Sequence, residues 1–390
     1  MAAADRALAR RASVRAARRS RAANGWLWAS VLLTGGAIAA AIALAPPAGA
    51  RPVAALSWLL FAGSSVHVAS TGWLFTVPEV RGYARAHAVR CLWVPAALIV
   101  TGAVVAAVVP PSAFGWLLLP YFCWQFLHYQ KQNIGMAALA ASAQRVRPLL
   151  HAERRALLLA GGAAIAALVA EPRLIGLRVD PVQALLPGWT LDGGRPPLFV
   201  LAAAAFALAA VSGCAALVGR PAAQRPAGFS LTYLSCLLFS LPVFVFGSPY
   251  AAIGGMTAAH GLQYLLLVSL VAGSGQGASP TRPDRPDRPD RPGRLVRLGL
   301  LANIALIGGA ALGAASHLHD AGPAGRLIFG AYLGVVMAHF VIDAGLWRMR
   351  DPLARQFLAS GLPYLVRASP PAGPATALSD PSSADIGCSP

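Results

Sequence analysis

The sequence is poor in charged side chains, and this scarcity limits the class of protein it can encode. Only 12% of its 390 residues are charged, whereas 57% are hydrophobic, and the mean hydropathy is +0.60. A soluble globular domain carries about 25% charged residues. Because the chain cannot cover its apolar surface with charge, we expect the lipid bilayer to be its solvent.

Acidic residues and lysine are scarcer still. The 32 basic residues face only 14 acidic ones, which gives a formal net charge of +18, and Lys131 is the single lysine. A charge of this size can attract nucleic acid. The arginines, however, lie between apolar segments, as the orientation signals of membrane proteins do. Nucleic acid is therefore not an expected partner, and the sequence does not indicate a protein partner.

Common cofactor and thiol motifs are missing as well. The five cysteines form no CxxC pair, so neither a disulfide framework nor a cysteine metal site is expected. The chain also has no GxGxxG or Walker loop, no GxSxG elbow and no CxxCH haem attachment motif. A cofactor, if bound, has to be held by side chains of the helical bundle.

The sequence does contain long apolar segments. A span needs about 20 apolar residues, and backbone groups in lipid must bond internally, so these segments are predicted helices. The fold class is all-α, a polytopic membrane bundle of about ten spans. The predicted spans are 25–45, 53–77, 90–109, 114–141, 156–170, 197–218, 228–246, 249–272, 295–316 and 325–347.

The connections between these spans alternate in charge. Arginine-rich segments alternate with connections almost free of arginine, apart from the long connection 171–196, and this places both termini in the cytoplasm of a multi-pass cell-membrane protein. The repeat PTRPDRPDRPDRPG is typical of a stiff, solvated linker. The predicted organisation is a basic N-terminal segment at 1–23, spans one to eight within 24–272, a Pro/Asp/Arg-rich linker at 273–294, two spans within 295–347 and a largely disordered cytoplasmic tail at 348–390.

Four of the eight histidines lie inside predicted spans. The spans that carry them all run in the same direction, and each histidine precedes the cytoplasmic end by a similar number of residues. The spread in depth is roughly 8 Å at 1.5 Å per residue. We therefore expect one layer of imidazoles that binds a metal, formed by His67, His128, His260 and His339.

Polar side chains accompany these histidines at helical spacing. Residues three or four apart share a helix face, and metal-bound histidines usually donate their second N–H to a carboxylate, amide or carbonyl. Lys131 has two other interpretations: it reaches toward the cytoplasmic face, or it pairs with Asp343. The predicted supporting set is Thr71, Gln125, Lys131, Gln132, Gln263, Tyr264 and Asp343.

The ligand types narrow the choice of metal. Imidazole suits iron, copper and zinc, and an all-histidine site with open positions favours a mononuclear non-haem iron centre. Haem b, with two of the four histidines as axial ligands, is the main alternative. A pair of haems stacked across the bilayer is disfavoured, because the four histidines share one layer.

The motifs SSVHVAST, HYQKQN, HGLQY and HFVID resemble those of the Brp/Blh-type membrane carotene dioxygenases. The resemblance implies an all-helical membrane enzyme that cleaves β-carotene to retinal at a four-histidine iron site, with His67, His128, His260 and His339 as the iron ligands. Unlike that family, the chain has no HxxxH pair within a span and has more spans. Histidine-box desaturases fit less well, because their HxxHH and HxxxH boxes are missing.

The sequence therefore predicts an iron-dependent oxygenase that acts on a lipophilic, carotenoid-like or lipid-like substrate taken from the bilayer. Ionisable groups within spans also build ion and proton paths, so a proton- or ion-coupled transporter is one alternative. A membrane subunit that binds haem b is the other.

Overall fold

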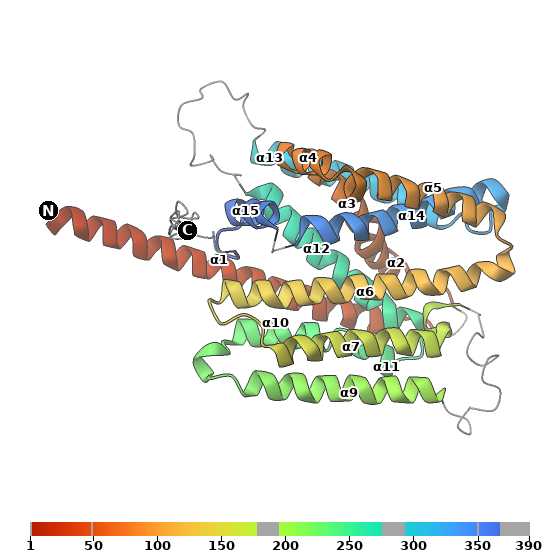
Figure 1. Cartoon of the computed structure of the whole chain (residues 1–390), viewed down its shortest axis with the longest axis horizontal. Helices are drawn as coiled ribbons and strands as arrows, with labels where there is room; N and C mark the ends of the chain where they lie inside the picture. Colours follow the sequence, from red (N-terminus) through yellow and green to blue (C-terminus); the bar gives the residue numbers. More distant parts are fainter. Residues whose placement is uncertain (1, 48–49, 178–194, 275–292, 349–350, 367–390) are drawn as a thin grey trace, which may run out of the picture.

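The computed structural model describes residues 2–47, 50–177, 195–274, 293–348 and 351–366, and all secondary structure in these ranges is helical. The predicted all-α class is thus confirmed. Most of the long helices lie side by side along one direction, and the first half of α1 projects beyond the bundle (Figure 1).

The elements follow the chain in a simple order. The first half contains α1 (Ala2–Ala43), α2 (Ala54–Phe61), the π-helical turn η1 (Ala62–Val66), α3 (His67–Leu74), α4 (Pro78–Ala86), the π-helical turn η2 (Val89–Trp93), α5 (Val94–Val108), α6 (Pro111–Ala143), α7 (His151–Ala170) and the 3-10 turn η3 (Pro172–Ile175). The second half contains α9 (Pro197–Val218), the 3-10 turn η4 (Ala222–Gln224), α10 (Ala227–Leu237), α11 (Leu241–Val245), the π-helical turn η5 (Tyr250–Gly254), α12 (Gly255–Gly273), α13 (Arg294–Ser316), α14 (Gly322–Leu346) and α15 (Pro352–Gly361).

Six of the described helices are long and apolar enough to cross a membrane. They are Ala16–Ala43, Val89–Val108, Pro197–Val218, Tyr250–Gly273, Arg294–Ser316 and Gly322–Leu346. The predicted count of ten is not confirmed. The remaining four predicted spans are helical but differ physically: 53–77 and 228–246 are divided into shorter elements, α6 carries the polar cluster in its second half, and α7 begins with the charged run Glu153–Arg155.

The outer surface of the bundle is apolar. On α9, the outward side chains Leu201, Leu208 and Val211 are 62–68% exposed, while Phe206 and Ala209 on the opposite face are buried. A helix that is apolar on both faces belongs in a protein core or in lipid. Since one face of α9 has no protein against it, the bundle is that of a membrane protein.

Basic connections gather at one end of the bundle. The α6–α7 and α9–α10 connections, the start of α13 and helix α15 lie at the same end as α4 and the N-terminal half of α1 (Figure 1). These are the segments whose arginines alternate with the arginine-poor connections in the sequence. The structure therefore groups on one side the segments that the charge pattern assigns to one side.

Helix α12 lies deepest in the bundle and packs against α1, η1 and α13. Its contact with η1 is unusually close, because a Cβ at Gly261 would overlap the carbonyl of Gly63 and a Cβ at Gly63 would overlap the backbone of Ala258. Small residues at such crossings let two membrane helices approach backbone to backbone. The crossing brings His67, four residues after Gly63, next to His260, which directly precedes Gly261.

Parts of three predicted segments lie outside the described residues: 178–194 of the long connection, 275–292 of the linker and 367–390 of the tail. The start of the predicted tail is described and differs from the expectation of disorder. Residues 352–361 form α15, and the side chains of Leu358, Leu362 and Leu365 are buried. Burial of these leucines gives this segment a fixed place against the bundle.

Candidate metal centre

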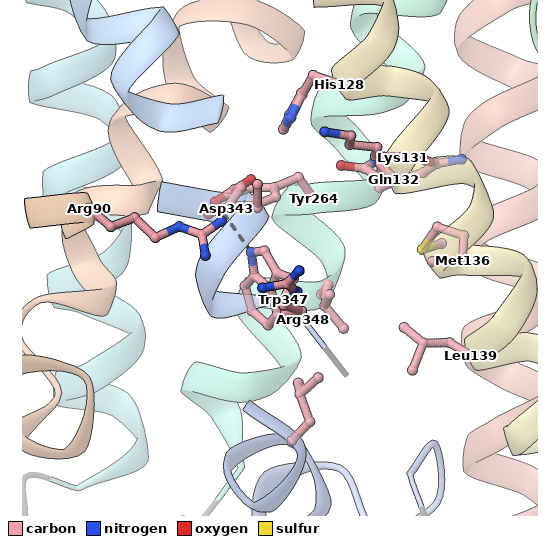
Figure 2. A pocket seen from close by; sticks show the side chains of 15 residues that line it. Arg90, His128, Lys131, Gln132, Met136, Leu139, Tyr264, Asp343, Trp347 and Arg348 are labelled. Carbon is pink, nitrogen blue, oxygen red and sulfur yellow. Dashed lines mark hydrogen bonds between the residues drawn. The ribbon is translucent and has the colours of Figure 1, made fainter. Parts of the chain in front are cut away.

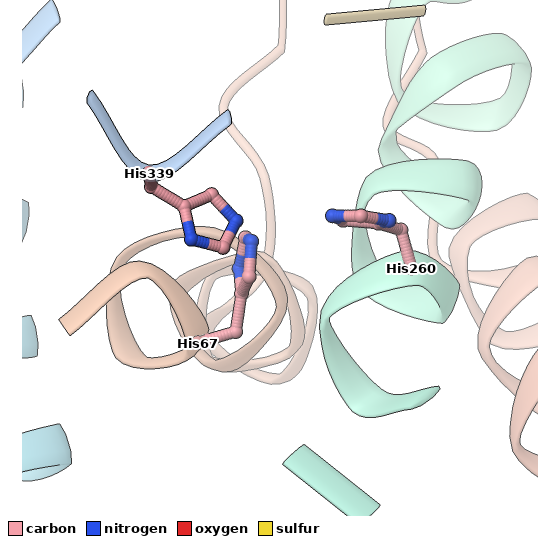
Figure 3. A group of neighbouring side chains, drawn as sticks. All are labelled: His67, His260 and His339. Carbon is pink, nitrogen blue, oxygen red and sulfur yellow. The ribbon is translucent and has the colours of Figure 1, made fainter. Parts of the chain in front are cut away.

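The four predicted histidines come together from four separate helices. His67 is the first residue of α3, directly after the π-helical turn η1, and His128 lies in α6. His260 lies in α12 and His339 in α14. Figure 3 shows His67, His260 and His339 converging on a common space from different ribbons. A π-helical turn contains one residue more than an α-helical turn, and such turns are frequent at functional sites.

The four imidazoles form a closed circuit. The ring centroids are 5.0 Å apart for His67 and His260, 4.9 Å for His260 and His128, 5.2 Å for His128 and His339, and 5.0 Å for His339 and His67. Each ring therefore has two imidazole neighbours at nearly equal distances. Neighbouring rings stand 68–90° apart, so they are not stacked.

These spacings match ligation of one ion. With a metal–nitrogen bond of about 2.1 Å, the centroid of a bound imidazole lies about 3.2 Å from the metal, so two ligands are about 4.5 Å apart at a right angle and about 5.2 Å apart in a tetrahedron. The observed 4.9–5.2 Å falls between these values. In addition, ligand atoms of His67, His260 and His339 all lie within 4.8 Å of one another, as do those of His128, His339 and Asp343.

The cluster is buried and short of hydrogen-bond partners. His67, His128, His260 and His339 are 4%, 7%, 1% and 2% exposed. No hydrogen bond of good geometry is made by the two ring nitrogens of His67, which lie near the backbone of Gly63 and Ser64, by those of His260, or by Nε2 of His128 and of His339. More than nine in ten buried polar groups are bonded, and an unsatisfied one costs about 1–3 kcal/mol. Six unpaired nitrogens in one cluster are typical of an ion-binding site and not of a finished core.

One histidine has a well-defined outer contact. His339 Nδ1 lies 2.7 Å from the hydroxyl of Thr71, which is in turn 2.8 Å from the hydroxyl of Tyr264. Tyr264 donates to Asp343 Oδ1 at 3.1 Å, and so does the indole N–H of Trp347 at 3.3 Å. This chain engages Nδ1 of His339 and leaves Nε2 without a hydrogen bond, which is the arrangement of a ligand oriented through its second nitrogen.

The Asp343 carboxylate lies beside the histidine cluster itself, and not only beside the residues that surround it. Its Oδ2 is 3.5 Å from His339 Nε2, and its carboxylate belongs to one of the two groups that could hold an ion. The ion pair with Lys131 that the sequence allowed does not form in the described structure. Asp343 is thus available as a fifth ligand or as the anchor of Tyr264.

In the described structure the predicted glutamines hydrogen-bond groups other than the imidazole rings. Gln132 donates to Gln263 Oε1 at 2.9 Å and to the His260 carbonyl at 3.1 Å, and Gln263 donates to Thr34 at 2.6 Å. Gln125 donates to the hydroxyl of Tyr129 at 2.5 Å. These amides fix α1, α6 and α12 relative to one another, because their bonds run mainly between helices and not to the histidine of the same helix.

Two aromatic rings and one buried hydroxyl complete the surroundings, and of these Phe340 and Thr34 were not predicted as site residues. Phe340 stacks on His128 with centroids 4.4 Å apart, and Tyr129 lies 4.4 Å from His260. Thr34, in α1, receives the bond from Gln263. Thr34 shares its apolar span with a second hydroxyl residue, Ser30, and is a weak signal because threonine hydroxyls often bond their own helix, as Thr34 does at the Ser30 carbonyl.

A cavity of about 390 Å³ opens beside the cluster. His128, Tyr264 and Asp343 line its inner part, and Figure 2 shows Arg90 and Lys131 reaching toward it from different helices. Its size lies in the range of about 300–1,000 Å³ found for small-molecule sites. Lys131 is thus an exposed residue that lines the pocket, and no ion pair between it and Asp343 is found among the described residues, while its reach toward the cytoplasmic face stays a prediction.

Fold and site together define a helical membrane protein with a buried cluster of four histidines beside a pocket. No protein-family model, curated protein or solved structure matches the chain. Its chemistry is therefore inferred from the geometry of these residues.

Proposed function

We propose that this protein is a membrane-embedded, histidine-ligated metalloenzyme, a non-haem iron oxygenase that acts on a lipophilic substrate. The observation that carries the proposal is the closed circuit of four buried imidazoles with six unbonded ring nitrogens. A proton network or a structural core gains nothing from leaving so many buried nitrogens unbonded.

The residues fit a single ion better than haem. His67, His128, His260 and His339 would hold the metal. Their ligand atoms form two groups that share His339, one with His67 and His260 and the other with His128 and Asp343. Two axial histidines of a haem must leave the plane between them to the macrocycle. Here every imidazole has two others at 4.9–5.2 Å, and these rings fill the space a porphyrin would need.

Imidazole and carboxylate ligands suit iron, and copper and zinc remain the alternatives to test. When bound, iron would supply oxygen activation. The described residues supply the rest: Thr71 orients His339, Tyr264 and Asp343 hold a proton between them, and Phe340 and Tyr129 exclude water from two of the rings.

The proposal of a lipophilic substrate rests on the surroundings of the histidine cluster. The cluster lies within an apolar bundle, and the adjoining pocket offers a place for a molecule that enters from the bilayer. The resemblance of SSVHVAST, HYQKQN, HGLQY and HFVID to the Brp/Blh-type carotene dioxygenases supports the same class of chemistry. We further propose a cell-membrane location, about ten spans and cytoplasmic termini, supported by the grouping of basic connections at one end.

The decisive experiment is elemental analysis of the purified full chain, with His128→Ala as the test variant and His319→Ala as the matched control. His319 is an exposed histidine whose side chain is 52% accessible, far from the cluster. We expect about one equivalent of a transition metal in the wild type and in the control, and a loss of most of it in His128→Ala.

Metal below about a tenth of an equivalent in the wild type after reconstitution, or equal loss in both variants, would reject the proposal. An ion- or proton-coupled transporter is then the better explanation. The hydrogen-bonded chain from His339 through Thr71 and Tyr264 to Asp343 is the observation that favours it. Metal-independent uptake in proteoliposomes would establish that function.

A further inference from the structure

The pocket beside the histidines is unusually rich in positive charge. Three of its lining residues are basic, Arg90, Lys131 and Arg348, and Asp343 is the only acidic one. Asp343 is moreover engaged by Tyr264 and Trp347 and lies near His339. The pocket of a protein with 12% charged residues therefore presents three cations to whatever fills it.

Basic residues near the ends of spans are expected as orientation signals, but Arg90 has a more specific position, while Lys131 and Arg348 are exposed residues that also line the pocket. Arg90 is half-buried, its Nε lies 3.4 Å from the carbonyl of Val341, and its side chain packs against Gly345. In Figure 2 its guanidinium points into the pocket toward Asp343, while Lys131 extends beside His128 and Arg348 lies next to Trp347. A cation held across a neighbouring helix is poorly placed to reach solvent.

The pocket is elongated, and apart from Gln132 and Gln263 its remaining lining side chains are mostly apolar. One face of α6 lines it from His128 to Leu139, a distance of about 16 Å at 1.5 Å per residue. At the end away from the histidines the lining consists of Met136, Leu139, Leu267 and Leu358. The cavity thus combines a polar, cationic part next to the cluster with an apolar part that suits a hydrocarbon chain.

We propose that the pocket binds an amphipathic ligand with an anionic oxygen head group, either a carboxylate or a phosphate. Arg90, Lys131 and Arg348 hold the head group, and the apolar end holds the hydrocarbon chain. Since this assigns the substrate class of the proposed metal site, it rests on the proposed function. It also departs from the carotene-cleaving resemblance, because a carotene has no charged group to engage three cations.

The test uses the full-length protein in a nonionic detergent and a long-chain polyene fatty acid whose fluorescence rises when it leaves water. The matching alcohol tests the need for charge, a lysophosphatidic acid tests a phosphate head group, and inorganic phosphate tests a free anion. The fatty acid should bind at least about tenfold more tightly than the alcohol, since bonds to a charged group are worth about 1.5–3 kcal/mol.

The variants are Arg90→Gln and Lys131→Gln, with Arg85→Gln as the control. Arg85 is an exposed arginine of α4 that does not line the pocket. Each pocket variant should weaken binding of the fatty acid about tenfold or more and leave binding of the alcohol unchanged. Arg90→Lys should restore part of the loss, which separates a charge effect from misfolding.

Metal content measured on the same samples keeps the two proposals apart. Normal metal content with equal binding of acid and alcohol would overturn the anionic head group and leave the metalloenzyme intact. Competition by inorganic phosphate as strong as that by lysophosphatidic acid would also overturn it, in favour of a free-anion site. Preference for the acid in a protein that binds no metal would reject the metalloenzyme while keeping the ligand class.

Discussion

Two buried polar clusters in this bundle have opposite hydrogen-bonding patterns. At the junction of α7 and α9, the side chains of Glu153 and Arg220 are 0% and 2% exposed, and the shortest distance between them is 2.6 Å. The histidine cluster is buried to a similar degree. The two clusters are therefore similar in burial and differ in how many of their polar atoms form hydrogen bonds.

The Glu153–Arg220 cluster is fully bonded. Arg220 donates to both carboxylate oxygens of Glu153 and to the carbonyls of Arg147 and Pro148, and the second carboxylate oxygen also accepts the Leu150 N–H. The guanidinium carbon lies 4.8 Å from the centroid of the Phe229 ring. Such a cluster locks a loop between two helices and leaves nothing for a ligand.

The histidine cluster shows the reverse. Its six unbonded nitrogens lower the stability of the fold unless a ligand binds to them. Removal of one partner from a satisfied buried pair leaves an uncompensated charge, whereas removal of an unsatisfied histidine removes a cost. Mutations should therefore separate the two clusters by stability, and the following expectations run from the largest effect to the smallest.

Arg220→Ala should destabilise the protein by about 3–5 kcal/mol, because Glu153 would stay buried without its partner. Unfolding in detergent, followed by circular dichroism, measures the change. Arg225→Ala removes an exposed arginine from the same connection and should be nearly neutral. A loss in Arg220→Ala no larger than that in Arg225→Ala would end the interpretation of this pair as a structural lock.

Gly261→Leu should cost about 1–3 kcal/mol through overpacking and should also lower metal content, since α12 must move away from η1 and carry His260 with it. Gly162 on α7 has open space around it, so Gly162→Leu is the matched control. Parallel unfolding and elemental analysis test the prediction. Full metal content in Gly261→Leu would show that the close crossing does not position the cluster.

His67→Phe should change the stability of the metal-free protein by less than about 1 kcal/mol, since an aromatic ring replaces a histidine whose nitrogens are both unbonded. Metal binding should nevertheless be lost. Metal addition should raise the unfolding temperature of the wild type but not that of the variant. Strong destabilisation of the metal-free variant would indicate that His67 serves the core.

Thr71→Val should leave the fold intact and lower metal affinity about 10–100-fold, because it removes the hydroxyl next to His339 Nδ1. Thr76, whose hydroxyl bonds only the carbonyl of Trp73 in the described structure, provides the control variant Thr76→Val. Titration of metal with a competing chelator measures both affinities. Equal affinities would remove Thr71 from the description of the site.

The sequence predicted the helical class and the convergence of four histidines, because both follow from composition and from position along each span. The hydrogen-bond partners of these histidines could not be predicted as well from the sequence. Helical spacing pairs residues within a helix, whereas Thr71 meets His339 and Gln132 meets Gln263 across helices. Which helices neighbour one another depends on contacts such as Gly63 with Gly261, and these leave only isolated glycines in the sequence.

The number of spans and the pocket were also hard to predict from the sequence, because both depend on how the helices bend and pack. Hydropathy alone does not show that 53–77 contains a π-helical turn or that α15 packs its leucines against the bundle. Arg90 reads as an orientation signal, because its position in the chain does not reveal that η2 directs its side chain into a cavity beside α14.

The π-helical turn before His67 also has a genetic consequence. Such a turn is an α-helix with one inserted residue, and one residue rotates the following chain by about 100°. The one codon that this turn has in excess of an α-helical turn therefore sets the direction of His67 toward its three counterparts. Deletion of one codon between positions 62 and 66 should turn His67 away from the other three histidines.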